Sequence, residues 1–306
     1  MTLDLIIIGI LTSGIRLATP YLYAAIGETF GQRSGVLNLG VDGQMLLGAF
    51  AAFYVAFTTE NLWLGLLAAV FVGALMGLAM AFVTVNLHAE QGISGIGFYL
   101  FGLGMSELLF KMLLGTVETV KGFPPVHIPL LGDIPIIGEI FFQQNIMVYG
   151  AFLLVPIAWF VLNKTTLGLK IRAVGENPEA ADSVGVSVAR IRYFTIILGG
   201  ILSGVAGASL SIALLNVFQQ NMTSGLGFIA VALVYFGAWR VRGVLAGALL
   251  FSMVNSLQLW MQVLNINIPS ELAVMLPYIL TIVVLVLTVS RVRAPSALTK
   301  PFERGD

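Results

Sequence analysis

The sequence contains no cysteine, and only two of its 306 residues are histidines. The absence of cysteine excludes a disulfide framework, a thiol nucleophile and a cysteine-ligated metal site. The two histidines, His88 and His127, lie far apart in the chain, which argues against a zinc site. We therefore expect this chain to hold no cofactor of its own.

Charge is also scarce, because only 10% of the residues are charged and the formal net charge is zero. A soluble domain carries roughly 25% charged residues, whereas here 58% of the residues are hydrophobic and the mean hydropathy is +0.98. This composition predicts a membrane protein. The lack of net positive charge argues against a nucleic-acid partner.

The sequence also lacks the short motifs of common catalytic sites. It contains no G-x-x-x-x-G-K-[ST] phosphate-binding loop, no G-x-S-x-G and no H-E-x-x-H. These absences argue against an enzyme and against ATP binding by a phosphate loop of this chain.

A membrane-spanning helix needs about 20 apolar residues, and the chain offers nine candidate segments. They are Leu3–Gly27, Val36–Phe57, Leu62–Leu87, Ile93–Gly115, Asn145–Leu162, Ile191–Val217, Leu226–Trp239, Val244–Leu264 and Leu272–Val289. The second segment is interrupted by glycines and the seventh is short, so each is a candidate for a broken or tilted helix buried against protein. The expected fold class is an all-α polytopic membrane protein with about nine transmembrane helices, built as one domain over residues 1–306.

Lys and Arg residues are distributed unevenly between the two predicted faces. Twelve of the fifteen fall on one face, and only Lys121 falls on the other. The positive-inside rule therefore places the loop Lys164–Arg192 and the C-terminus in the cytoplasm. With nine spans, the N-terminus is predicted to lie outside.

The loop Lys164–Arg192 combines a dense run of charge with a short helix signal. Asn177 suits an N-cap, Pro178 suits the first helical position, and Gly185 suits the residue after the helix. A helix Pro178–Val184 of about two turns is marginal in water, so it needs a surface to lie on. That surface is a partner protein or the membrane interface, unless the segment is an ordinary connecting loop.

The segment Thr116–Gln144 is the sizeable element predicted on the outer face. Its four prolines, Pro124, Pro125, Pro129 and Pro135, prevent it from forming one continuous helix. The apolar residues between them make it too hydrophobic for a free linker. We expect it to pack on the outer membrane surface, either as a cap over the helices or as a docking surface.

Polar residues within the predicted spans need a reason, because burying them in lipid is costly. Asn38, Asp42 and Gln44 lie in the glycine-interrupted second segment. They either face a polar pathway, or Asp42 simply neutralises Arg16 of the first segment.

A polar stripe follows one face of the eighth segment, where Asn255, Gln258 and Gln262 recur at a spacing of three to four residues. In lipid such a stripe turns inward. It either joins helices or lines an aqueous path, and the length of the stripe favours the path.

Two further patterns recur at four-residue spacing within the spans. Glu107 and Lys111 are placed to pair on one helix face. Small residues repeat in the sets Gly73 and Gly77, and Gly200, Gly204 and Ala208. This small-xxx-small spacing favours close contacts between helices.

Two stretches carry a family resemblance, RSGVLNLGVDGQMLLGAF (Arg33–Phe50) and LGLKIRAVGENPEAADSVGVSVARIRYFTIILGGILSGVAGA (Leu167–Ala208). Through them the chain resembles the permeases of ABC importers, within the branched-chain amino acid and simple-sugar permease superfamily. The nucleoside (guanosine-type) and simple-sugar permeases of that group look most similar, and the outer stretch IPLLGDIPIIG is similar to theirs.

The resemblance implies a membrane-spanning subunit of an ATP-driven importer for nucleosides or simple sugars, in the cytoplasmic membrane of a prokaryote. The implied partners are ABC ATPase subunits that bind ATP and Mg²⁺, a second permease subunit (a copy or a paralogue), an extracytoplasmic substrate-binding protein, a small-molecule substrate and membrane lipid. The alternatives are an ion-coupled secondary carrier that acts without an ATPase, for which Arg16, Asp42 and Glu107 are the candidate groups, and a purely structural membrane subunit.

Two sets of functional residues follow. The predicted coupling set, which by analogy with these permeases docks on the ATPase, is Gly175, Glu176, Asn177, Pro178, Glu179, Ala180, Ala181, Asp182 and Gly185. The predicted substrate-pathway set is Asn38, Asp42, Gln44, Asn255 and Gln258. In this mechanism of alternating access, the short helix transmits the motion of the ATPase to the spans.

Overall fold

The computed structural model of the chain describes residues 3–129, 131–264 and 293–303, together with residues 275–277, 279–280, 282–283 and 286. Seven helices in these ranges are long and apolar enough to cross a membrane. They are α1 (Leu3–Arg33), α2 (Val41–Thr59), α3 (Leu62–Ala81), α4 (Gln91–Leu113), α6 (Ile146–Lys164), α9 (Val188–Ser209) and α11 (Val241–Val263). The π-helical turns η1 (Phe82–Asn86) and η2 (Leu210–Leu214) extend α3 and α9, and the shorter helices are α5 (Ile137–Phe141), α7 (Thr166–Glu176), α8 (Pro178–Ser183) and α10 (Leu226–Phe236).

This architecture confirms the predicted helical membrane protein. The seven long helices correspond to the first six predicted segments and the eighth. The seventh segment is the 11-residue helix α10, which is shorter than the roughly 20 residues that a complete span needs. The ninth, Leu272–Val289, lies largely outside the described residues, so the count of nine spans stays a prediction.

The glycine-interrupted second segment is broken, as predicted. Residues 34–40 are not helical, and α2 begins only at Val41. Gly35 has a φ of +91°, a left-handed conformation that glycine adopts without steric penalty. The break leaves a non-helical connection at the end of α1.

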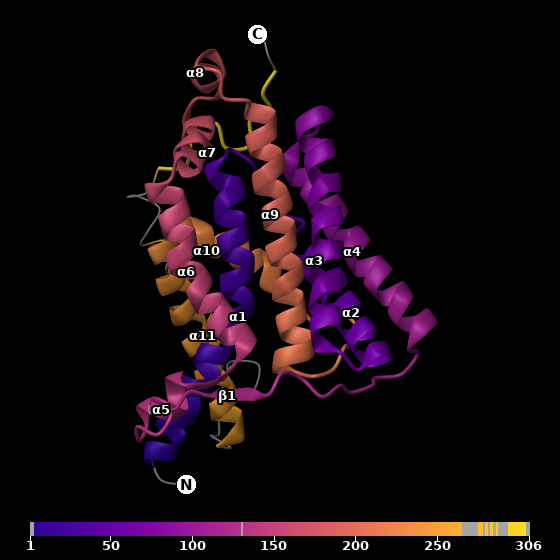
Figure 1. The fold of residues 1–306 in the computed structure, drawn as a ribbon, viewed down its shortest axis with the longest axis vertical. Coiled ribbons are helices and arrows are strands. Elements are labelled where there is room, and N and C mark those ends of the chain that lie inside the picture. Colours follow the sequence, from indigo (N-terminus) through magenta and orange to yellow (C-terminus); the bar gives the residue numbers. More distant parts are fainter. Residues whose placement is uncertain are drawn as a thin grey trace.

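Helix α9 forms the centre of the bundle and packs against α1, α2 and α3 (Figure 1). Glycines make these contacts possible, because a Cβ atom on Gly200 would meet the backbone of Gly73 and Gly77 on α3, with the Gly77 Cα only 2.8 Å away. A Cβ on Gly204 would likewise meet the backbone of α3 at Ala69 and Gly73. We call these contacts between α3 and α9 the glycine seam. The seam confirms the close helix contacts that the small-residue spacing predicts.

The bundle has two distinct ends (Figure 1). The α8 end holds α7, α8, the start of α9 and residues 293–303, and Arg33 lies there within electrostatic reach of Arg172 and Arg240. The β end holds the start of α1, α5 and a small antiparallel sheet of β1 (Pro125–His127) and β2 (Gln143–Asn145). Basic residues of distant segments therefore gather at one end of the bundle.

The segment Thr116–Gln144 forms no continuous helix, as its prolines predict. It is built from β1, the short helix α5 and the start of β2. Ile140 is buried in a cluster with Ile8, Ile15 and Val148, whereas Ile137 is 50% exposed. One side of the segment thus covers the bundle, and the other side carries exposed apolar residues.

Candidate functional site

The short helix predicted in the central loop is present as α8. The Asn177 Oδ1 accepts a hydrogen bond from the Ala180 N–H at 3.0 Å, and Pro178 is the first helical residue. Helix α8 ends at Ser183, one residue before the predicted end, and Gly185 follows with a φ of +85°. The cap and the glycine stop are therefore confirmed.

Helix α7 was not predicted, since residues 164–176 were expected to form part of a loop. The Thr165 hydroxyl caps it by accepting a hydrogen bond from the Gly168 N–H at 3.1 Å. Ile171 and Val174 are fully buried and Leu167 is half-buried. Their spacing of four and three residues is a helical signal that the high charge of the segment concealed.

The predicted coupling residues divide into three groups by exposure. Glu176, Asn177, Glu179, Ala180 and Gly185 are exposed, Pro178 and Asp182 are half-buried, and Gly175 and Ala181 are buried. Gly175 lies so close to the backbone carbonyl of Arg33 that no side chain fits there. Gly175 and Ala181 therefore pack α7 and α8 onto the bundle, and the exposed group forms the outward surface.

A segment from the far end of the chain braces this surface. The Ala297 N–H donates to the Gly175 carbonyl at 2.9 Å, and the Thr299 N–H donates to the Gly35 carbonyl at 3.1 Å. The Ser296 hydroxyl donates to the Glu176 carboxylate at 3.2 Å. Residues 296–299 thus tie α7 to the connection after α1, a contact that no pattern in the sequence indicates.

Asp42 is fully buried and caps the start of α10. Its carboxylate accepts hydrogen bonds from the Gly227 N–H at 2.8 Å and from the Thr223 hydroxyl at 3.0 Å. A negative charge is stabilised at a helix N-terminus. Arg16 donates instead to the Gln144 side chain, with 2.8 Å between Nε and Oε1. The predicted alternative that Asp42 neutralises Arg16 was therefore wrong.

Asn38 and Gln44 belong to a buried hydrogen-bond chain. The Asn38 Nδ2 donates to the Gln44 Oε1 at 3.2 Å, and the Asn38 N–H donates to the Glu28 carboxylate at 3.0 Å. Glu28 also accepts from Gln32, which accepts in turn from the Trp239 Nε1 at 2.7 Å. Glu28 and Gln32 were missed because the first predicted segment ended at Gly27, whereas α1 continues to Arg33.

Asn255 and Gln258 line a cavity of about 190 Å³ between α1, the start of α10 and α11. We call it the membrane cavity. Tyr21 and Thr223 line it as well, and Thr223 is the residue that donates to Asp42. The stripe on α11 therefore lines the cavity directly, and the Asp42 carboxylate on α2 is connected to it through the hydrogen bond from Thr223.

Two remaining predictions concern ionisable groups. Lys111 and Glu107 form the expected pair, with 2.7 Å between Nζ and Oε1. Within the described ranges, no group of three His, Asp or Glu side chains is placed to hold a metal ion.

Comparison with known proteins gives a consistent result. The family model described as "Branched-chain amino acid transport system / permease component" matches residues 10–285. The chain is 39% identical to the putative glucose ABC transporter permease protein TsgC13 of Haloferax volcanii, over 97% of this chain and 98% of that protein. It is 37% identical to the guanosine ABC transporter permease protein NupQ of Bacillus subtilis, over 94% of each chain.

A second guanosine permease of Bacillus subtilis, NupP, is also similar. It is 27% identical over 77% of this chain and 70% of that protein. No solved structure matches the chain.

Proposed function

Because this chain belongs to the family of permease components of branched-chain amino acid transport systems, we propose that it imports nucleosides or simple sugars as one subunit of an ATP-driven ABC importer. The observation that carries the proposal is similarity over nearly the whole chain to permeases named for guanosine and glucose transport. The family match favours a permease subunit over a carrier that works alone.

The remaining subunits follow from the same proposal. Separate ATPase subunits bind ATP and Mg²⁺, and an extracytoplasmic protein delivers the substrate. The second permease subunit is a copy of this chain or a paralogue. The presence of two similar guanosine permeases in Bacillus subtilis supports a paralogue.

The exposed side of α8 is the proposed contact with the ATPase. It presents Asn177, Glu179 and Ala180, and the packing of Gly175 and Ala181 holds it against the bundle. A displacement of α8 is therefore transmitted to α1 through backbone contacts rather than through a flexible loop. Rigid-body tilting of the membrane-spanning helices would then open the membrane cavity alternately to the two sides of the membrane.

The membrane cavity is the proposed place where the substrate passes. Its lining combines amide side chains, the hydroxyls of Thr223 and Ser224, and the rings of Tyr21 and Phe251, whose centroids are 5.4 Å apart. Binding sites for small molecules typically pair apolar walls with a few polar groups that fix orientation. Sugars and nucleosides share the hydroxyl groups that such amides recognise.

We predict that Asn255→Leu or Gln258→Leu reduces uptake. Losing one hydrogen bond to the substrate should weaken transport roughly two- to tenfold at low substrate concentration. The measurement is uptake of labelled guanosine and glucose into proteoliposomes that contain this chain, its permease partner and the ATPase. The matched control is Gln262→Leu, because Gln262 belongs to the same stripe but is exposed outside the cavity.

Two results would count against the proposal. Normal uptake by both cavity variants would show that the stripe only joins helices. Uptake driven by an ion gradient without ATP would instead favour the secondary carrier.

The proposed orientation is N-terminus outside and α8 in the cytoplasm, with nine spans. Since the chain is free of cysteine, single cysteines at Thr2 and Ser183 can be probed with an impermeant thiol reagent. We expect Thr2→Cys to be labelled in intact cells and Ser183→Cys, on the exposed side of α8, to be labelled only after permeabilisation. The reverse pattern would overturn this orientation.

A further inference from the structure

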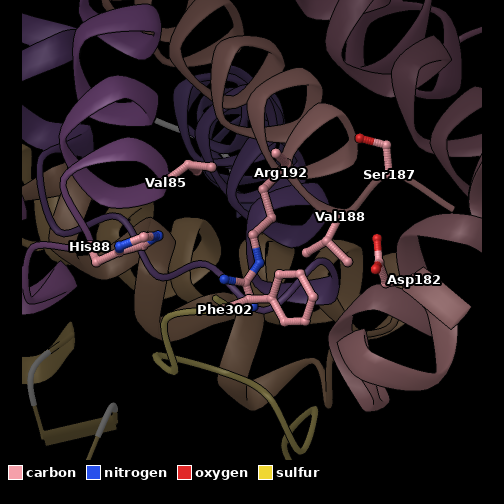
Figure 2. A pocket seen from close by; sticks show the side chains of 8 residues that line it. Val85, His88, Asp182, Ser187, Val188, Arg192 and Phe302 are labelled. Carbon is pink, nitrogen blue, oxygen red and sulfur yellow. The ribbon is translucent and has the colours of Figure 1, made fainter. Parts of the chain in front are cut away.

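A second cavity, of about 260 Å³, opens at the α8 end where α9 begins (Figure 2). We call it the α9 cavity. Its walls include Ser187, Val188, Ala189 and Arg192 from the start of α9, and Phe302 from the C-terminal segment. None of the lining residues belongs to the predicted pathway set, and Asp182 of the coupling set also lies in the lining, so the α9 cavity is separate from the proposed substrate pathway.

Arg192 is the unusual residue of this cavity. Its side chain is only 2% exposed, and its Nε and Nη2 atoms have no hydrogen-bond partner among the described residues. A buried charge without partners is costly, so buried cations are normally paired with an anion. Figure 2 shows the guanidinium reaching from α9 into the cavity.

The helix start supplies further positive potential. Val188 and Ala189 are the first residues of α9, and the first N–H groups of a helix have no partner within it. The Ser187 side chain accepts a hydrogen bond from the N–H of Arg190. This cap therefore does not bind the N–H groups of Val188 and Ala189. Helix N-termini of this kind bind phosphate and related anions.

We propose that the α9 cavity binds a phosphate group, held by the Arg192 guanidinium and the first N–H groups of α9. A phosphate supplies several acceptor oxygens, which match a guanidinium and backbone N–H donors together. Phe302 closes one side of the site. The phosphate belongs either to free inorganic phosphate or to a phospholipid headgroup at the membrane surface.

Two neighbouring groups limit where the ligand lies. Asp182 on α8 is the acidic residue in the lining, and Figure 2 places it and His88 on opposite sides of Arg192. The ligand therefore lies toward Arg192 and away from Asp182. The His88 Nδ1 is 3.0 Å from the Glu303 carboxylate, so the proposed site does not depend on His88.

The test is thermal unfolding of the purified full chain in detergent, with inorganic phosphate added at constant ionic strength against chloride. The unfolding temperature of the wild type should rise with phosphate concentration, because a ligand that binds only the folded state stabilises it. Arg192→Gln should weaken this binding by roughly ten- to a hundredfold. Arg190→Gln should keep it, because Arg190 is an exposed arginine two residues away on the same helix.

Further variants and lipids make the test independent of any folding defect in Arg192→Gln. Ala189 is exposed at the cavity, so Ala189→Glu should fold and block phosphate binding with its own carboxylate. If only nanodiscs of phosphatidylglycerol, and not phosphate or phosphate-free galactolipid, stabilise the chain in an Arg192-dependent manner, the ligand is a lipid headgroup. A wild type that neither source stabilises, or an Arg192→Gln variant that responds like wild type, would overturn the proposal.

Discussion

Replacing Ala180 by tryptophan is expected to abolish most ATP-driven uptake while leaving the chain folded in the membrane. Ala180 is exposed on α8, so a larger side chain has room in the isolated chain but would hold an ATPase away from the helix. Disrupting a central interface residue typically costs about 2 kcal/mol or more, which corresponds to a roughly thirtyfold weaker association. Co-purification with the ATPase, ATP hydrolysis and uptake in proteoliposomes measure the loss.

Two neighbouring variants separate docking from folding. Ala181 is 3% exposed, so Ala181→Trp should disrupt the packing of α8 itself and lower the yield of folded chain. Asn177→Ala should have a smaller effect than Ala180→Trp, because losing a helix cap costs about 1 kcal/mol. Wild-type ATPase binding and uptake in Ala180→Trp would show that α8 is not the docking element, and the ion-coupled carrier would regain support.

Replacing Gly200 by leucine should break the glycine seam and prevent stable folding. A Cβ atom there meets backbone atoms of Gly73 and Gly77. Helix backbone cannot move away by changing rotamer, as a flexible side chain can. Overpacking usually costs about 1–3 kcal/mol, and the central position of α9 places this substitution at the upper limit or beyond it. The folded fraction after size-exclusion chromatography and the unfolding temperature in detergent measure the effect.

Gly97→Leu is the matched control for this substitution. Gly97 lies in the transmembrane helix α4, and a Cβ there meets nothing within 4 Å. It should therefore behave like wild type. If Gly200→Leu is as stable as Gly97→Leu, α3 and α9 do not pack as closely as the seam requires.

Local signals in the sequence were the most reliable. The cap at Asn177, the proline after it and the glycine at 185 act within a few residues, so the sequence alone predicts α8. The break before α2 follows in the same way, because Gly35 adopts a backbone conformation that other residues avoid. The seven long helices are predicted by the length of each apolar segment, which is also a property of a continuous stretch of sequence.

Long-range contacts were not predictable by this reasoning. Asp42 is one of several polar residues in its segment, and only the fold brings the start of α10 to it, 185 positions away. The pairing of Arg16 with Gln144 also depends on the path of the outer segment, and a nearby carboxylate looked equally suitable. The bracing of α7 by residues 296–299 uses backbone N–H groups, which every residue except proline carries.

The hydrogen bonds from residues 296–299 also set an order of events during protein synthesis. Ser296 follows its partner Glu176 by 120 positions, and at about 5–20 residues per second the ribosome makes it roughly 6 to 24 seconds later. During that interval the carbonyls of Gly175 and Gly35 lack these donors. The packing of α7 against the end of α1 is therefore completed only after residues 296–299 have been made.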